Sequence, residues 1–177
     1  MTVVTAYQNV LTQEEWDTVF NDYLRHPEWR YGHTSNSYER TTVHPRPQYW
    51  LMELHHKEYF KEYLCQKILD LIPVKGLRVR NVYAGGNTFG TCGDIHTDSE
   101  CGDNYTFLYH ASPDVWKPMY GGKTNFYPDN APAEYYEFTP NGGLFFKSNV
   151  LHVGEPVTRY FDGLRICLAF KLVPLLS

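Results

Sequence analysis

The sequence lacks the features that define several large classes of protein. No apolar run reaches the roughly 18 to 20 residues that a membrane-spanning helix needs. The first residues show no basic start followed by an apolar stretch, so no signal peptide is predicted. Four cysteines are present, but none are spaced as CxxC, which argues against a zinc site and a disulfide framework. We therefore expect a cytoplasmic protein with reduced thiols.

Positive charge is also scarce. The 177 residues carry 16 Lys and Arg against 20 Asp and Glu, which gives a net charge of −4, and there is no basic run. Proteins that grip a phosphate backbone usually have a basic face. We therefore expect neither a nucleic-acid partner nor a membrane partner. The length fits one domain, which we expect to span residues 1–177.

Helical signals dominate the first part of the chain. Thr12 and Glu15 fit a capping box at the start of a helix that is expected to run from 12 to about 24. A second helix is predicted over 56–71, with Pro73 beyond its end. Short strands are predicted at 28–32 and 48–54. We expect residues 1–75 to form a helical support for the rest of the chain.

Short strands separated by turn signals follow. The first begins at Leu77, and strict alternation would put Asn81 and Tyr83 on the same face as Leu77 and Val79. The later strands are expected at 105–111, 123–127, 134–138, 143–146, 150–153 and 164–172. Helices followed by many short strands predict an α+β fold, with the helices packed on one side of a β-sandwich or jelly roll.

The stretch Asp94-Ile95-His96-Thr97-Asp98 carries the strongest chemical signal. If it is a strand, His96 and Asp98 point to the same side, because residues two apart share a face. His152 follows a turn between two apolar strands and supplies a third candidate ligand. Two histidines and one carboxylate with open positions form the facial triad of non-haem Fe(II) oxygenases.

A histidine and an acid two residues apart are weak evidence alone. The spacing occurs three times here, beginning at His26, His56 and His96, where chance predicts about one. Only the third follows a glycine-rich loop and is expected in a strand. Further along, Arg165 shares a strand face with apolar neighbours. It forms either a buried ion pair or a guanidinium fork for the carboxylate of a small ligand.

Several motifs resemble the Fe(II)/2-oxoglutarate-dependent dioxygenases, in particular the prolyl 4-hydroxylase-like branch. In order they are NVYAGG, HTD, GGKTNF, PNGGLFF, LHVGEPV and GLRICLAFKL, and together they cover roughly Leu77 to Leu172. The resemblance implies a double-stranded β-helix core over 76–173. It also implies Fe(II), with 2-oxoglutarate and O₂ as cosubstrates and ascorbate as reductant. The implied reaction is hydroxylation of a peptide or an amino acid, with release of succinate and CO₂.

The resemblance also assigns roles to residues. His96, Asp98 and His152 match the iron ligands. Arg165 matches the partner of the distal 2-oxoglutarate carboxylate, with Arg159 as a competing choice.

The remaining cosubstrate contacts follow from the same resemblance. Asn81 and Tyr83 are similar to an Asn-x-Tyr pair that hydrogen-bonds 2-oxoglutarate in some relatives. His110 stands where many prolyl hydroxylases carry a cosubstrate-binding tyrosine, and the adjacent Tyr109 is the tyrosine we predict for that contact.

Two other interpretations stay open on sequence. One is an AlkB-type nucleic-acid demethylase, which the Asn81-x-Tyr83 pair favours, although that family usually has arginine where Lys171 stands. The other is a non-catalytic metal-binding jelly-roll protein. Candidate substrate-facing groups are the loop 35–47, Tyr120 and the turn 100–104.

Overall fold

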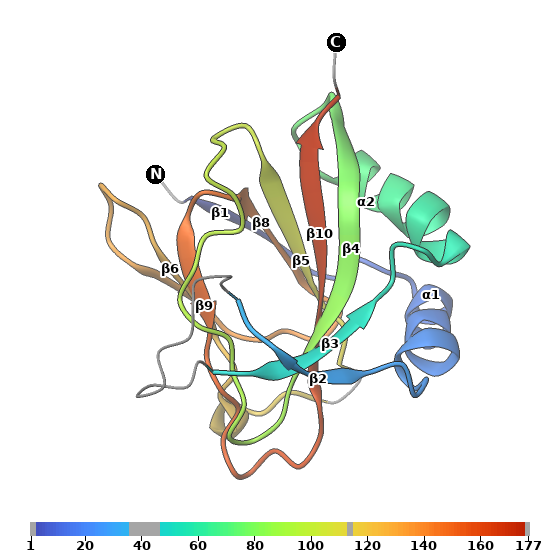
Figure 1. Cartoon of the computed structure of the whole chain (residues 1–177), viewed down its shortest axis with the longest axis vertical. Coiled ribbons are helices and arrows are strands. Elements are labelled where there is room, and N and C mark those ends of the chain that lie inside the picture. The colour runs from blue at the N-terminus through green and yellow to red at the C-terminus, as the bar shows by residue number, and fades with distance from the viewer. Residues whose placement is uncertain (1–2, 36–46, 113–114, 176–177) are drawn as a thin grey trace.

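Two antiparallel sheets form the framework of the molecule. The computed structural model describes residues 3–35, 47–112 and 115–175. The major sheet has seven strands in the order β1-β8-β5-β10-β4-β3-β2, and the minor sheet has three in the order β7-β6-β9 (Figure 1). The major strands are β1 (Val4–Tyr7), β2 (Arg30–His33), β3 (Tyr49–Glu53), β4 (Leu77–Asn87), β5 (Tyr105–His110), β8 (Gly143–Lys147) and β10 (Arg165–Pro174). The minor strands are β6 (Thr124–Tyr127), β7 (Glu134–Tyr136) and β9 (Leu151–Gly154).

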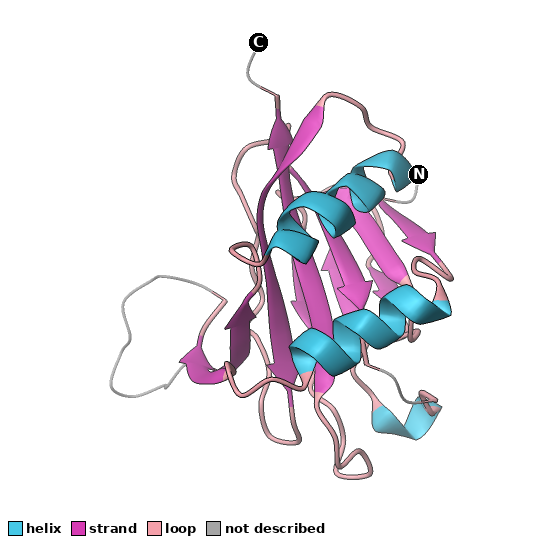
Figure 2. Ribbon diagram, turned by 90° about the vertical axis from the view of Figure 1, so that its right-hand side faces the viewer, coloured by secondary structure: helices cyan, strands magenta, loops and turns pink. Residues whose placement is uncertain are grey.

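Both predicted helices are present and lie against the same face of the major sheet (Figure 2). The first consists of α1 (Gln13–Thr18) continued by the π-helical η1 (Val19–Leu24), and both bonds of the predicted capping box are formed. The second consists of the π-helical η2 (Tyr59–Leu64) followed by α2 (Cys65–Leu71). A short 3₁₀ turn, η3 (Pro118–Tyr120), lies in a later loop.

The main hydrophobic core lies between the helices and the major sheet. Val19 and Phe60 from the helices are fully buried, as are Phe107 and Leu168 from β5 and β10. A smaller core that includes Phe126 and Phe146 lies on the opposite face, between the two sheets. The helices therefore seal one face of the major sheet and leave the other to the minor sheet. The predicted jelly-roll fold with helices on one sheet is confirmed.

One strand went unpredicted. β1 is only four residues long and pairs with β8, so its partner lies some 140 residues away in sequence. A strand this short, paired with so distant a segment, has no local sequence pattern that predicts it. Because β1, β2 and β3 all belong to the major sheet, the chain before residue 76 supplies three strands of that sheet as well as the helices.

A β-bulge changes which residues of β4 share a face. Opposite Lys171 and Leu172 of β10 stand Asn81 and Val79, so Arg80 is an extra residue on β4. Leu77 and Val79 consequently pack into the helix-side core, while Tyr83 faces the other way. The expectation that all four alternate residues share one face is wrong, because strict alternation cannot survive an inserted residue.

No helix in the described part of the chain is long and apolar enough to cross a membrane. The cytoplasmic location stays a prediction. All four cysteines are free thiols, as expected.

Candidate metal centre and adjoining cavity

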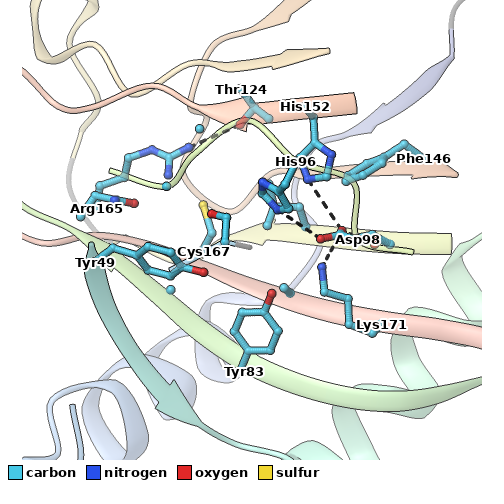
Figure 3. A pocket seen from close by; sticks show the side chains of 18 residues that line it. Tyr49, Tyr83, His96, Asp98, Thr124, Phe146, His152, Arg165, Cys167 and Lys171 are labelled. Atoms are coloured by element: carbon cyan, nitrogen blue, oxygen red, sulfur yellow. Dashed lines mark hydrogen bonds and ion pairs between the residues drawn. The ribbon is translucent and has the colours of Figure 1, made fainter. Parts of the chain in front are cut away.

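Three of the predicted site residues converge on the face of the major sheet that the helices leave open. The ligand atoms of His96, Asp98 and His152 lie within 4.8 Å of one another (Figure 3). His96 Nε2 is 3.3 Å from Asp98 Oδ1, and His152 Nε2 is 3.7 Å from Asp98 Oδ2. His152 lies in β9, after the turn from β8, as predicted.

The segment that carries His96 and Asp98 is not a strand, which corrects the expectation. It is an extended loop joined to β9 by one antiparallel bridge, in which His96 and His152 exchange both backbone hydrogen bonds at 2.9 Å. The Asp98 amide donates to the carbonyl of Ser148 at 2.8 Å. These three bonds are enough to aim both side chains at His152 without a full strand.

The histidine tautomers are fixed by their backbone partners. Nδ1 of His96 lies 2.8 Å from the carbonyl of Asp94, and Nδ1 of His152 lies 2.8 Å from that of Val150. A carbonyl oxygen only accepts, so each Nδ1 carries a proton, and in the neutral form of each ring Nε2 presents a lone pair. Burial lowers the pKa of His152 to about 4, so this ring is neutral at pH 7. Two lone pairs and a carboxylate that face one another without a proton between them favour a bound cation.

Asp98 is held from the other side by two donors. Its Oδ2 accepts from Lys171 Nζ at 2.5 Å and from Thr106 Oγ1 at 2.6 Å. Burial would raise the pKa of Asp98, but the Lys171 ammonium and the neighbouring histidines hold it well below its usual range. The carboxylate is therefore ionised and fixed in orientation, as a metal ligand must be.

Arg165 lies at the other end of the same cavity and is buried. Its Nε donates to the carbonyl of Gly122 at 2.9 Å, its guanidinium reaches Thr124 Oγ1 at 3.4 Å, and it stands 4.9 Å from the centre of the Phe138 ring. Among the described residues no carboxylate lies within ion-pair distance of Arg165. This rules out a buried ion pair within that part of the chain and leaves a charged donor without an anionic partner.

Gly122 makes this arrangement of Arg165 feasible. Its φ of +74° is one that side chains other than glycine rarely adopt, and a Cβ there would lie 2.8 Å from Arg165 Cδ. Backbone conformation and the close approach of Arg165 thus explain why the second position of the GGKTNF motif is glycine.

No family model and no curated protein sequence matches the chain. Solved structures do match. An oxidoreductase of the 2OG-Fe(II) oxygenase family from Burkholderia pseudomallei superposes with a TM-score of 0.71, at 9% identity, over 99% of this chain and 89% of that one. A prolyl hydroxylase from Trichoplax adhaerens, in complex with a hypoxia inducible factor peptide fragment, gives 0.71 at 15% identity, over 97% and 84%. The epimerase SnoN from nogalamycin biosynthesis gives 0.69 at 14%, over 97% and 76%.

The chain has the 2-oxoglutarate/Fe(II) oxygenase fold. Within this fold the cavity runs between the His96 end and the Arg165 end. Cys167 and Ala169 of β10 line it together with Arg165, which confirms the predicted shared face. Residues of neighbouring strands that also line it, and that the sequence did not single out, are Tyr49, Asn87, Thr106, Leu108, Thr124 and Phe146.

Two tyrosines add hydroxyl groups to the cavity (Figure 3). Tyr83 lines the cavity, as predicted, and its ring lies 5.5 Å from Lys171 Nζ. Tyr49, from β3, was missed, because the sequence predicted the strand but not which of its faces meets the site. Burial raises the pKa of both phenols, so both remain protonated hydrogen-bond donors at neutral pH.

Tyr109 does not line this cavity, which corrects the expectation of a cosubstrate contact there. On β5, Thr106 and Leu108 face the cavity, so Tyr109 faces the helices. Its hydroxyl donates to Asn141 Oδ1 at 3.1 Å within the main core. Its sequence neighbour His110 is on the cavity side but stacks on Phe138 at 4.4 Å, and burial lowers its pKa to about 3.

Other sequence candidates lie outside the cavity. Asn81 lines a separate polar hollow behind Asp98, together with Asn104 from the predicted turn. Arg159 is exposed and stands 6.0 Å from the Phe89 ring, so of the two arginines only Arg165 lines the cavity. Tyr120 packs on Trp116 and Phe161.

The two remaining sequence signals have different outcomes. Of the loop 35–47, Ser35 lines the cavity, while 36–46 lie outside the described residues. His26 forms an exposed pair with Glu28 at 3.3 Å, so that His-x-acid string has no part in the site.

Proposed function

We propose that the protein is an Fe(II)- and 2-oxoglutarate-dependent oxygenase that hydroxylates an unactivated C–H bond. His96, Asp98 and His152 would hold the metal, and Arg165 would bind the distal carboxylate of 2-oxoglutarate. Bound Fe(II) would supply the site at which O₂ and 2-oxoglutarate are converted to succinate, CO₂ and an oxidised substrate. The strands before residue 76 complete the sheet that carries the site, so we further propose that residues 1–177 act as one domain.

The observation that carries this proposal is that Arg165 is buried and has no anionic partner in the described chain. A buried guanidinium with no carboxylate nearby in the described chain is costly unless a ligand supplies the anion. The cavity that it lines ends at three side chains whose lone pairs and carboxylate suit a cation. A small dicarboxylate-like molecule that chelates a metal at one end and needs a cation at the other fits these two ends.

The chain's own groups have distinct tasks in this scheme. Arg165 fixes the cosubstrate, and the protonated Tyr83 hydroxyl offers a donor between its two ends. The Nδ1 bonds to backbone carbonyls hold the rings of His96 and His152 in the orientation that a metal requires. Phe146 and Leu108 limit the water that reaches the centre.

For the substrate we propose a prolyl residue in a peptide, or a free amino acid. The Trichoplax prolyl hydroxylase has the same fold and its structure contains a peptide, which supports a peptide substrate. The epimerase SnoN has this fold too, so the fold is compatible with other reactions. Among the residues that line the cavity, Ser35, Tyr49 and Gly93 present neutral groups, which suits an uncharged residue such as proline.

A substrate panel tests the proposal. The protein is incubated with Fe(II), 2-oxoglutarate and ascorbate as reductant, and succinate is measured with prolyl peptides, free amino acids and methylated oligonucleotides. We expect substrate-coupled succinate with a peptide or an amino acid. Succinate coupled only to an oligonucleotide would replace hydroxylation with oxidative demethylation, and none with any substrate would contradict the proposed activity.

Arginine variants test the cosubstrate end. Arg165→Met should weaken 2-oxoglutarate binding by about 10- to 100-fold, as expected for the loss of a charged hydrogen-bonded pair. Arg159→Met is the matched control and should bind like the wild type. Equal effects of the two substitutions would refute the role of Arg165.

A further inference from the structure

Lys171 stands on the wall between two hollows. With Asp98 it lines both the oxygenase cavity and the polar hollow behind it, which also contains Asn81 and Asn104. Its ammonium is 2.5 Å from Asp98 Oδ2 (Figure 3). The side chain of Lys171 is 20% exposed and that of Asp98 4% exposed, so this pair is largely shielded from water. Neither the metal ligands nor the cosubstrate contacts proposed above include Lys171.

The two oxygens of Asp98 have different surroundings. Oδ2 accepts from the Lys171 ammonium and from the Thr106 hydroxyl, which itself lies 3.0 Å from Ser148 Oγ. Oδ1 lies 3.3 Å from His96 Nε2 and has neither the lysine nor the threonine beside it. A carboxylate oxygen that already accepts two hydrogen bonds has little remaining capacity for a metal.

The difference matters because a carboxylate can bind a metal through one oxygen or through both. Two histidines and one oxygen leave about three positions of an octahedral ion, whereas two oxygens leave about two. A chelating cosubstrate would use two positions. Only the one-oxygen arrangement then leaves a position for O₂.

We propose that Lys171 is a positioning residue that restricts Asp98 to one metal-binding oxygen and thereby keeps a coordination position open. The inference rests on the proposed function, because it assumes that the triad binds a metal. Thr106 assists through the same oxygen. A lysine that served only to neutralise a buried carboxylate would stabilise the fold without changing how many water molecules the metal carries.

Mn(II) is a suitable probe, because the relaxation of water protons reports how many exchangeable waters it binds. In Lys171→Met, Asp98 is free to use both oxygens, so we expect the bound Mn(II) to give about two-thirds of the wild-type relaxation enhancement, two waters in place of three. Saturating 2-oxoglutarate should leave about one-third of the wild-type enhancement in the wild type and almost none in the variant.

Two further variants serve as controls. Lys171→Arg keeps the cation and should restore the wild-type enhancement. Lys123→Met removes a surface lysine that pairs with Glu137 at 2.8 Å and should leave it unchanged. If Lys171→Met does not fold, Thr106→Val replaces it as the test, because it removes the other donor to Asp98 Oδ2. It should also lower the relaxation enhancement.

The outcomes separate this inference from the proposed function. Wild-type enhancement in Lys171→Met, or in Thr106→Val where that variant decides, overturns the role of Lys171 while the metal site stands. A wild-type protein that shows no Mn(II)-dependent enhancement, or an enhancement that Fe(II) does not compete away, contradicts the metal site itself.

Discussion

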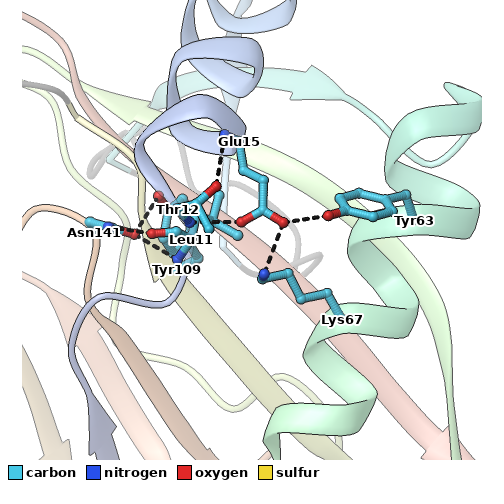
Figure 4. Close-up of polar contacts among 7 residues, drawn as sticks. All are labelled: Leu11, Thr12, Glu15, Tyr63, Lys67, Tyr109 and Asn141. Carbon is cyan, nitrogen blue, oxygen red and sulfur yellow. Dashed lines mark hydrogen bonds and ion pairs between the residues drawn. The ribbon is translucent and has the colours of Figure 1, made fainter.

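Two buried carboxylates, Glu15 and Asp98, have similar partners but opposite roles. Glu15 Oε1 accepts from the Tyr63 hydroxyl and from Lys67 Nζ at 2.8 Å, and its Oε2 accepts from the Thr12 amide at 2.7 Å (Figure 4). Asp98 also pairs with a lysine and a hydroxyl, but through Oδ2 alone. Both oxygens of Glu15 thus accept from protein donors other than histidine, whereas Oδ1 of Asp98 faces His96 Nε2, a candidate metal-ligating atom.

The comparison teaches how to tell a structural acid from a ligand. The Glu15 cluster is complete, and it ties the first helix to the second. Beside it, Asn141 accepts from the Leu11 amide at 2.9 Å and from the Tyr109 hydroxyl at 3.1 Å, which attaches the same helix to the sheet. In the proposed function, the Asp98 cluster is complete only with a bound metal cation. Removing a side chain from the Asp98 cluster should therefore impair metal binding, whereas removing one from the Glu15 cluster should lower stability alone.

The largest expected effect is that of His152→Ala. Without this ligand, metal-dependent activity should fall by more than about 100-fold, since even outer partners of a metal typically cost 10- to 100-fold. The metal-free variant should also lose some stability, because the buried ring packs against Phe126 and Phe146 and its removal leaves a cavity. Added Mn(II) should raise the melting temperature of the wild type only. A variant that Mn(II) still stabilises as it does the wild type would break the contrast between the clusters.

Glu15→Gln should act in the reverse sense. It removes a charged acceptor from Lys67 and Tyr63, and we expect a loss of about 2 kcal/mol in the free energy of unfolding. Metal and cosubstrate affinity should be unchanged. Denaturant unfolding together with a metal titration measures both quantities. The control Glu14→Gln alters the neighbouring acid, which takes no part in the hydrogen bonds of Glu15 to Tyr63, Lys67 and Thr12, and should leave stability almost unaltered.

Lowering the pH should remove the contribution of the Glu15 cluster to stability. Burial opposes ionisation of Glu15, but its bonds to Lys67 and Tyr63 prevail and lower its pKa to about 2 from 4.5. A depressed pKa stabilises the folded state above pH 4.5, and this contribution is lost as the pH falls towards 2. The stability difference between the wild type and Glu15→Gln should therefore shrink across that interval. A stability difference that stays constant down to pH 2 would show that these contacts do not lower the pKa of Glu15.

The smallest effects should come from two tyrosines on opposite faces of the major sheet. Tyr83→Phe should weaken 2-oxoglutarate binding about 2- to 10-fold, the loss of one hydrogen bond. Tyr109→Phe should leave that affinity unchanged and cost about 1 kcal/mol of stability, because it breaks the bond to Asn141. Calorimetry and thermal melting distinguish them. A reversal of the two results would restore the sequence-based assignment of Tyr109.

Much of this contrast was predictable from sequence. Thr12 and Glu15 were identified as a capping box, because its members lie three residues apart. His96, Asp98 and His152 were brought together as expected, and Arg165 was placed on the correct face of its strand. These predictions rest on spacing within one element or on motifs in a known order.

The failures involve contacts between distant elements. Nothing local pairs Lys171 with Asp98 or Lys67 with Glu15, since both pairs depend on how elements pack. The bulge at Arg80 altered the face pattern of β4, and the choice of Tyr109 required the face of β5, which is fixed by its pairing with β8 and β10. Strand register is a tertiary property, so it cannot be obtained from alternation alone.

The most direct test of the central claim is an anaerobic titration of the Fe(II)-loaded protein with 2-oxoglutarate, followed by visible absorption. Chelation of iron in this cavity predicts a weak charge-transfer band that grows with 2-oxoglutarate, saturates at one equivalent and is absent from His152→Ala. A wild-type protein that binds Fe(II) but develops no band, or a band that persists in His152→Ala, would contradict the account.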